Sequence, residues 1–225
     1  MIQRYIIFFI LFFIPQIIFA QDFFRIKADF SIKTKLPDGK QYLTMGTVYY
    51  DKTVRTTVYQ IRFPEKEIWV NKDTNMYKII DNKIISRQSV PAVIEFSIFH
   101  LTLNGNLADY GLKKTSFTIE KTEKDKGMVI TTWKPPANFA KRLGKIMVSN
   151  QDKKLQGIIF FNPAGTIISK QFFKKYFNSN GLEFPSEIVQ INYTNGKEGY
   201  ELTTYSKILV NDLNEENIYN YRLPK

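Results

Sequence analysis

The sequence contains no cysteine and a single histidine, His100. The absence of cysteine excludes disulfide bonds, cysteine metal sites and thiol nucleophiles. With one histidine, a histidine-based catalytic triad or zinc site would depend on that side chain alone. His100 lies in an apolar stretch, where a core residue with a satisfied ring is the simpler interpretation. The sequence therefore predicts no catalytic residues, no metal ligands and no cofactor.

Other features of enzymes and of nucleic-acid binding proteins are also scarce. No glycine-rich loop follows a strand and opens a helix, so a phosphate cradle is not supported. The pair Lys174-Lys175 is expected to be solvated rather than to bind nucleic acid. Several acidic residues fall in turns, where their side chains favour turn conformations: Asp38, Asp51, Asp81 and Asp152. An exported hydrolase is therefore the weakest of the functional alternatives.

The first twenty residues have the pattern of a secretory signal peptide. Arg4 precedes an apolar run over residues 5–19, which is short for a stable membrane span. The small residue Ala20 then precedes Gln21 and suits signal peptidase. We expect cleavage of residues 1–20, with an uncleaved membrane anchor as the alternative. Residues 21–225 would then form one domain in the periplasm, and because this domain begins with glutamine rather than cysteine, we expect it to carry no lipid anchor.

The chain is basic, with 32 Lys and Arg against 21 Asp and Glu and a formal net charge of +11. Such a charge fits a partner with anionic groups, for example lipid headgroups. The lysines are spread over many turns rather than gathered in one run. Solubility and a general preference for lysine therefore explain the charge equally well.

Apolar and polar residues alternate through most of the mature sequence, as in half-buried strands. The first example runs from Phe24 to Lys33 and ends at the turn Pro37-Asp38-Gly39. Similar strand-and-turn units continue to Asn211 and include a hairpin at Thr194-Asn195-Gly196. We expect about twelve antiparallel strands, and a sheet of that size must curl or close.

The segment from Ser89 to Leu103 breaks this alternation. Ser89-Val90-Pro91 is typical of a helix start, with Ser89 as the N-cap. The residues that follow are apolar nearly all round, which predicts a helix over residues 91–103. A strand is the alternative. Because the segment is too apolar for a wet surface, we expect it on the concave side of the sheet.

A series of short motifs shares its order and spacing with one known family. An opening strand with a glycine, a strand that ends in proline, an apolar strand before a polar turn, a proline-containing helix start and a closing tail follow one another. They are Gly46-Thr47-Val48-Tyr49-Tyr50, Phe63-Pro64, Ile68-Trp69-Val70 with Met76-Tyr77, Val90-Pro91-Ala92 with Ile94, and Tyr205 with Val210-Asn211 and Leu223-Pro224. In this order they resemble the LolA-like family of periplasmic outer-membrane lipoprotein carriers.

The resemblance covers nearly all of residues 23–224 and has departures. Thr53, Val90 and the pair Asp73-Thr74 stand where the family has proline, threonine and Asp-Gly. The resemblance implies a mainly β fold, in which one highly curved antiparallel sheet forms an open β-barrel around an apolar cavity with a helical lid. It also implies an acylated lipoprotein or lipid as ligand. An inner-membrane release complex and an outer-membrane acceptor would be the transfer partners of a monomeric carrier.

Apolar strand faces and the predicted helix provide the expected lipid-binding residues. These are Phe30, Met45, Tyr59, Ile61, Phe63, Ile94, Phe96, Ile98 and Phe99. Arg55 shares a strand face with Tyr59 by parity, and a buried arginine needs a specific partner. The resemblance implies that Arg55 holds the empty lid through hydrogen bonds to its backbone. The alternative is that Arg55 lies beyond the core and is solvated.

A carrier would avoid the free-energy cost of exposing acyl chains to water. Each CH₂ group costs about 0.8 kcal/mol in water, so a chain of about sixteen carbons costs on the order of ten kcal/mol. A lid that fills the empty cavity would keep the affinity moderate and allow the ligand to be handed on. A lipid-sensing or protein-interaction domain of the same fold is the alternative function.

Overall fold

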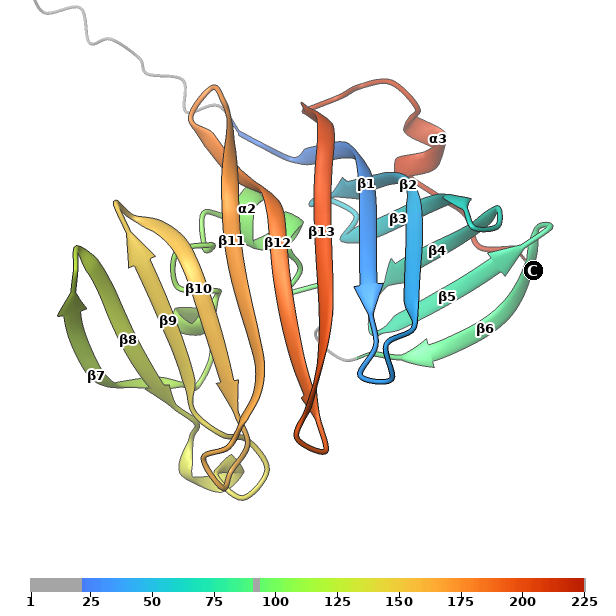
Figure 1. The fold of residues 1–225 in the computed structure, drawn as a ribbon. Helices are drawn as coiled ribbons and strands as arrows, with labels where there is room; N and C mark the ends of the chain where they lie inside the picture. Colours follow the sequence, from blue (N-terminus) through green and yellow to red (C-terminus); the bar gives the residue numbers. More distant parts are fainter. Residues whose placement is uncertain (1–21, 91–93, 225) are drawn as a thin grey trace, which may run out of the picture.

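The computed structural model describes residues 22–90 and 94–224. The predicted signal peptide and its cleavage site lie outside these residues, and so do residues 91–93 of the predicted helix. The described chain forms one antiparallel sheet of thirteen strands (Figure 1). Within it, no helix has both the length and the apolar character needed to span a membrane.

The strands follow the predicted alternation, because a side-chain period of two places apolar residues on one face. In chain order they are β1 (Arg25–Lys35), β2 (Gln41–Asp51), β3 (Thr56–Phe63), β4 (Glu67–Lys72), β5 (Asn75–Ile80), β6 (Lys83–Ser89), β7 (Thr118–Asp125), β8 (Met128–Lys134), β9 (Ile146–Gln151), β10 (Lys154–Phe161), β11 (Ile167–Ser179), β12 (Leu182–Thr194) and β13 (Lys197–Val210). The α-helices are α2 (Ile98–Leu103) and α3 (Glu216–Tyr219), and the 3₁₀ helices are η1 (Leu112–Lys114) and η2 (Ala137–Phe139).

Two meanders join at the pair β1 and β13, which brings the beginning and the end of the domain together. The strand order is β6-β5-β4-β3-β2-β1-β13-β12-β11-β10-β9-β8-β7, so β6 and β7 are the two edges. Every residue of both edge strands is exposed. The sheet is therefore curved but not closed, and the predicted open β-barrel is confirmed.

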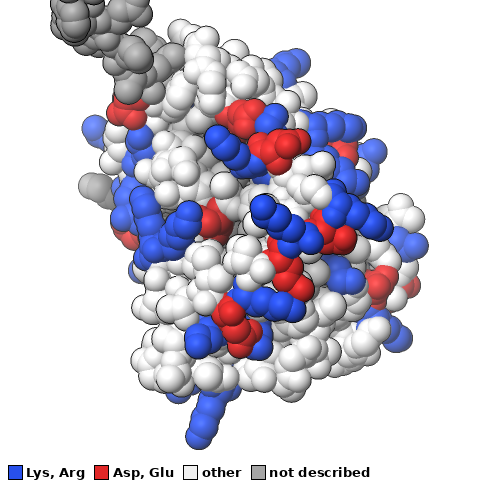
Figure 2. All heavy atoms as spheres, turned by 90° about the vertical axis from the view of Figure 1, so that its left-hand side faces the viewer, with Lys and Arg blue, Asp and Glu red and all other residues white. Residues whose placement is uncertain are grey.

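Charged side chains protect the edge strand β7 against pairing with other chains. Lys121 pairs with Glu123 at 2.8 Å, and Glu120 pairs with Lys145 of the neighbouring loop at 2.6 Å. Figure 2 looks at the side of the molecule where β7 and β8 lie and shows basic and acidic side chains intermingled. Charges of this kind discourage pairing with a strand of another chain.

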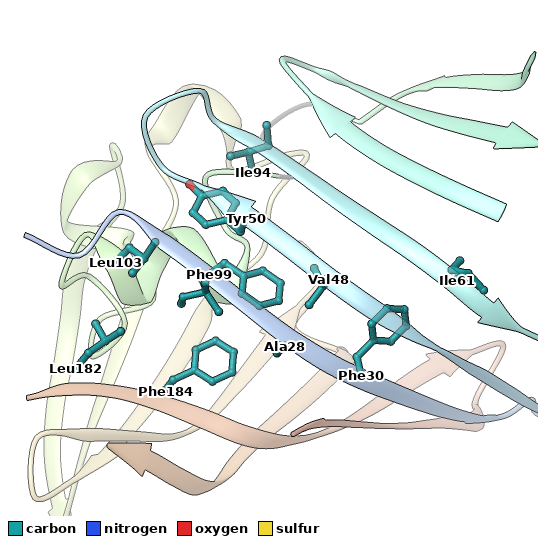
Figure 3. Packing of buried hydrophobic residues seen from close by; sticks show 11 residues of the cluster. Ala28, Phe30, Val48, Tyr50, Ile61, Ile94, Phe99, Leu103, Leu182 and Phe184 are labelled. Carbon is teal, nitrogen blue, oxygen red and sulfur yellow. The ribbon is translucent and has the colours of Figure 1, made fainter. Parts of the chain in front are cut away.

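The concave face of the sheet carries two hydrophobic clusters. We call the first the central cluster; Figure 3 shows its side chains pointing toward one another from β1, β2, β3, β12 and the segment 94–103. Its members are Ile26, Ala28, Phe30, Val48, Tyr50, Ile61, Ile94, Phe99, Leu103, Leu182 and Phe184. The second cluster continues it beneath β8–β11 and includes Leu101, Tyr110 and Trp133.

The convex face is covered at one end by the C-terminal segment. Tyr219 of α3 is 1% exposed and packs on Tyr49, Val58 and Val70, where its ring meets that of Tyr49 at 5.5 Å edge to face. Arg25 joins this segment to the sheet. Its Nε donates to Asp51 at 2.5 Å, and its Nη1 donates to Glu216 at 2.5 Å.

The predicted helix over 91–103 is too long. Helix α2 begins at Ile98, after turns at Ile94–Ser97, and its N-cap is Ser97, whose Oγ accepts from the His100 amide at 3.2 Å. Ser89 is the last residue of β6 and pairs with Asn75. The sequence prediction was wrong here because the ladder between β5 and β6 takes Ser89 into the sheet.

Candidate functional site

Helix α2 lies against the concave face and is held there by Phe99. This side chain is 1% exposed, and its ring stacks on Tyr50 at 6.0 Å and on Phe184 at 5.6 Å. Tyr205 meets the same ring edge to face at 5.5 Å. Strands from both meanders therefore meet through one aromatic side chain of the helix.

Most of the predicted lining residues lie on this face. Phe30, Ile61, Ile94 and Phe99 belong to the central cluster, and Tyr59 and Ile98 pack against it. Phe96 packs against the second cluster and stacks on Tyr110 at 5.9 Å. The structure thus brings seven predicted residues together in two adjoining clusters. Phe30, Tyr59 and Ile61 lie on strands, and the other four belong to the segment that covers them: Ile94, Phe96, Ile98 and Phe99.

Met45 and Phe63 do not belong to this group. Met45 is 41% exposed and Phe63 is 47% exposed. Met45 pairs with Ser31, whereas the neighbouring pair of Phe30 and Gly46 faces inward. A β-bulge between Met45 and Gly46 then places Phe63 opposite Met45, at the exposed end of the strand pair. The bulge accounts for the exposure of Phe63, whereas Met45 follows the regular alternation of β2, which places it on the outward face with Tyr49.

Gly46 takes the inward position, and the close approach of β3 explains why. A Cβ atom on residue 46 would lie 2.1 Å from the carbonyl oxygen of Gln60. No other residue fits there without a shift of the backbone. The glycine of the opening strand motif is therefore required by the contact between β2 and β3.

Arg55 contacts the segment before α2, but from an exposed position. It lies in the turn before β3 with a φ of 50°, so the prediction that it shares a strand face with Tyr59 is wrong. Its guanidinium pairs with the Glu95 carboxylate, and 56% of its side chain is exposed. The expected hydrogen bonds to the lid backbone are replaced by this ion pair, and the solvated alternative describes Arg55 better.

His100 has the structural role that the sequence indicated. Its Nδ1 lies 2.7 Å from the hydroxyl of Tyr50. Burial and, secondarily, the Arg55 guanidinium hold the pKa of His100 below its ordinary value. The ring is therefore neutral at neutral pH, and the contact ties α2 to β2.

A polar row crosses the concave face beside the central cluster, and the sequence analysis did not identify it. Glu201 pairs across the sheet with Thr34 on β1 and Gln190 on β12. Gln190 in turn accepts from Gln171 at 3.3 Å. Alternation along β13 could have revealed it, because Glu201, Thr203 and Tyr205 follow one another on a single face.

Glu201 has few partners for a carboxylate in this position. Thr203 Oγ donates to it at 3.5 Å, and in the described part of the chain no lysine or arginine pairs with it. Burial raises the pKa of Glu201, and the Thr203 hydroxyl opposes the rise only in part. Burial and the Glu201 charge together raise the pKa of Tyr59 to about 12.

We expect Glu201→Gln to raise the free energy of unfolding at neutral pH. A raised carboxyl pKa gives stability that is full below the unfolded pKa, about 4.3 for glutamate, and is lost as the pH rises through the folded pKa. The amide of Gln does not ionise, so the variant does not lose this stability as the pH rises, and its advantage over the wild type should vanish in acid. Urea unfolding of both proteins from acid to neutral pH measures the difference in unfolding free energy. An equal difference at every pH would contradict the raised pKa of Glu201.

The concave face has apolar and hydrogen-bonding groups but no set of side chains for catalysis. In residues 22–90 and 94–224 no group of three or more His, Asp or Glu side chains could hold a metal ion. Two hollows of about 490 and 500 Å³ lie outside the apolar clusters. One is beside the loop before β9, and the other crosses β1, β2, β12 and β13, with Thr34 and Glu201 of the polar row in its lining. The site is thus an apolar concavity, now filled by the segment 94–103, with a polar row beside it.

Comparison with known proteins gives matches in structure. No family model matches the sequence, and no curated protein matches it either. A LolA superfamily protein from Nitrosomonas europaea is 15% identical, with a TM-score of 0.58 over 89% of this chain and 91% of that one. A putative outer membrane lipoprotein-sorting protein domain from Vibrio parahaemolyticus is 13% identical, with a TM-score of 0.61 over 87% and 89%. A DUF1329 family protein from Desulfovibrio piger is 9% identical, with a TM-score of 0.61 over 90% and 92%.

The protein is thus an open, highly curved antiparallel barrel with a short helix across its apolar concave face. This is the fold of the LolA superfamily, and the resemblance seen in the sequence is confirmed in the fold. At these identities the likeness establishes the architecture. The function has to be argued from the concave face itself.

Proposed function

We propose that this protein is a periplasmic carrier that shields the acyl chains of a lipoprotein or another lipid and delivers them to the outer membrane. One observation carries the proposal: the concave face is lined by apolar residues and covered by the segment Ile94–Leu103 and the loop after it, with Leu107, Tyr110 and Leu112, rather than by a second sheet. Turns and one six-residue helix make up this segment. Displacing it would open an apolar surface without breaking any strand pair of the sheet.

The exchange of lid for ligand explains how such a carrier could release its cargo. The acyl chains would replace Phe99 and its neighbours on the same aromatic surface, so loading exchanges one set of apolar contacts for another. The closed state thereby competes with the ligand and lowers its apparent affinity. The polar row at Glu201 would face the polar linkage of the same ligand, beside the chains.

The proposal is tested by asking what the protein binds. Protein exported by its host should yield acylated molecules in organic extracts measured by mass spectrometry, and the emptied protein should bind a fluorescent fatty acid. Tyr59→Asp, on the strand wall that the chains would contact, should abolish this binding, because an unpaired carboxylate in an apolar site costs several kcal/mol. A folded wild type that binds no acylated ligand would refute the carrier function, and full binding by a folded Tyr59→Asp protein would refute the site.

Removing the Arg55–Glu95 ion pair should change the rate of ligand release more than the rate of ligand binding. The pair joins the turn before β3 to the segment before α2, so it stabilises the closed state alone. Because both side chains are largely exposed, the expected effect is small, about 0.2–1 kcal/mol or up to fivefold in release rate. Arg55→Leu should slow release of a lipopeptide to acceptor vesicles, whereas Arg87→Leu on the edge strand β6 should leave release unchanged. Equal rates for Arg55→Leu and the wild type would contradict the role of the pair.

A further inference from the structure

The convex face of the sheet is covered at one end only. The C-terminal segment packs over β2–β5, and α3 contacts β2 and β3. In Figure 1 the other part of this face, formed by β1 and β13 to β10, is turned toward the viewer with α2 behind it. Among the described residues, no helix covers this part.

Strand register gathers apolar side chains on this uncovered surface. One row across the sheet holds Leu43, Lys33, Leu202, Val189, Phe172 and Gly157, and the next holds Gln41, Lys35, Tyr200, Ile191, Lys170 and Ile159. We call these two rows the convex patch. Phe172 is 38% exposed and Tyr200 is 40% exposed. The rows cross six strands, so they extend about 24 Å at about 4.8 Å per strand.

A hollow of about 500 Å³ lies within the convex patch. Leu43, Val189 and Leu202 line it together with Lys33 and Lys35, and the rest of the lining is Thr34, Gln41, Tyr42, Tyr200 and Glu201. Apolar residues therefore form part of a surface depression that is lined by two lysines and one glutamate. Contiguous exposed apolar surface of this kind marks an interaction site rather than an ordinary solvated face.

The charges of this surface define the partner. Lys33, Lys35, Lys170 and Lys174 form no ion pair with any other described residue. Of the acidic residues close to the patch, Glu187 pairs with Lys175 at 2.6 Å, whereas Glu198 accepts from the Tyr200 hydroxyl and keeps its charge. The lysines without an ion pair outnumber Glu198, so the surface is positive, and the same surface of a second copy of this chain would repel it.

Lysines that stand among apolar side chains suit a lipid surface in particular. A lysine can lay its alkyl stem on apolar groups and keep its ammonium at the level of the headgroups. Tyrosine rings are also favoured at this boundary, and Lys170 already lies over the Tyr193 ring with its Nζ 5.4 Å from the centroid. Apolar contact combined with attraction to anionic headgroups is how proteins bind a membrane surface without crossing it.

We propose that the convex patch docks the protein on a lipid surface that carries anionic headgroups. The concave face, with helix α2, then points away from the bilayer plane and stays accessible along the open edges of the sheet. Membrane contact and acyl binding would use opposite faces of one sheet. This inference therefore does not depend on the proposed carrier function.

Vesicle co-sedimentation of the exported protein tests the proposal. The wild type should bind vesicles of phosphatidylcholine and phosphatidylglycerol, should bind pure phosphatidylcholine far more weakly, and should lose binding as salt is added. The triple variant K33E/K35E/K170E should bind at least about tenfold more weakly, since each lysine near an anionic surface contributes about 1 kcal/mol. The matched variant K66E/K83E/K124E changes the net charge equally, at exposed positions outside the patch, and should retain most of the binding.

A second pair of variants tests the apolar contribution. Phe172→Ser should weaken binding severalfold, whereas Leu213→Ser, which alters a side chain 74% exposed outside the patch, should not. Absence of binding to anionic vesicles, or an equal loss in both triple variants, would overturn the proposal and favour a protein partner or a general effect of charge. Fatty-acid binding measured in parallel separates the two proposals, because the patch variants should retain it. If the wild type binds vesicles but no fatty acid, the carrier function fails and the docking surface stands.

Discussion

Replacing Phe99 by alanine should destabilise the protein and at the same time tighten its binding of an acyl ligand. The ring is 1% exposed and contacts Tyr50, Phe184 and Tyr205, so its loss leaves a cavity and should cost about 3–5 kcal/mol of unfolding free energy. In the proposed carrier those contacts hold the closed state, which would compete with the ligand. Weakening them should raise the apparent affinity for a fluorescent fatty acid by tenfold or more, at about 1.4 kcal/mol per factor of ten.

The control for this prediction is an aromatic residue of equal burial on the other face. Tyr219 is also 1% exposed, but it packs against the convex side of β2 and β3. Tyr219→Ala should reduce stability without changing ligand affinity. If Phe99→Ala unfolds, Phe99→Leu is the alternative variant, with a smaller loss of stability and a smaller gain in affinity. A Phe99 variant that binds the ligand no better than the wild type would show that α2 does not compete with it.

The second large effect is expected at Arg25. Asp51 is fully buried and Arg25 is 7% exposed, so Arg25→Met leaves a buried carboxylate without its partner. Removal of one member of such a pair costs about 3–5 kcal/mol, most of it from the uncompensated charge. Contact with Glu216 and with the Tyr219 ring, 4.4 Å from the guanidinium, would be lost as well. Urea unfolding at neutral pH measures the loss.

The pH dependence of this loss identifies its cause. Burial alone would raise the pKa of Asp51, but hydrogen bonds from Thr53 and Arg25 outweigh it and hold the pKa below the ordinary value. A lowered carboxyl pKa gives stability that is present above the unfolded pKa and lost as the pH falls through the folded one. The difference between wild type and variant should therefore shrink in acid. Lys145→Met, which removes an exposed pair with Glu120, should cost only about 0–1 kcal/mol.

These two predictions address different parts of the same architecture. Phe99 packs on the concave face and would leave it in the proposed carrier, whereas Arg25 holds β1, β2 and the C-terminal helix α3 together. A carrier needs both properties, since its wall must persist while its lid moves. Low stability should therefore be confined to the segment before and within α2, and hydrogen exchange can locate it.

Local pattern was enough to predict most of the strands and the class of fold. Alternation over Phe24 to Lys33, the turn at Asn195-Gly196 and the apolar run before Leu103 reflect forces within a few residues. The short motifs led by Gly46 then indicated the LolA-like fold. The same local rules failed at Ser89, where pairing with Asn75 in the sheet overrides the signal for a helix start.

What the sequence by itself determined, then, is a β-rich chain with one apolar segment that must be buried. Only the tertiary structure decided which residues face inward where a bulge shifts the register, as at Phe63. It also decided that Arg25 meets a carboxylate 191 residues away, and that Lys33, Leu202 and Phe172 share one row of the convex patch. The physical reason is that register, bulges and ion pairs across the sheet depend on contacts between distant segments. Alternation along a single strand marks its two faces but does not specify what either face will meet.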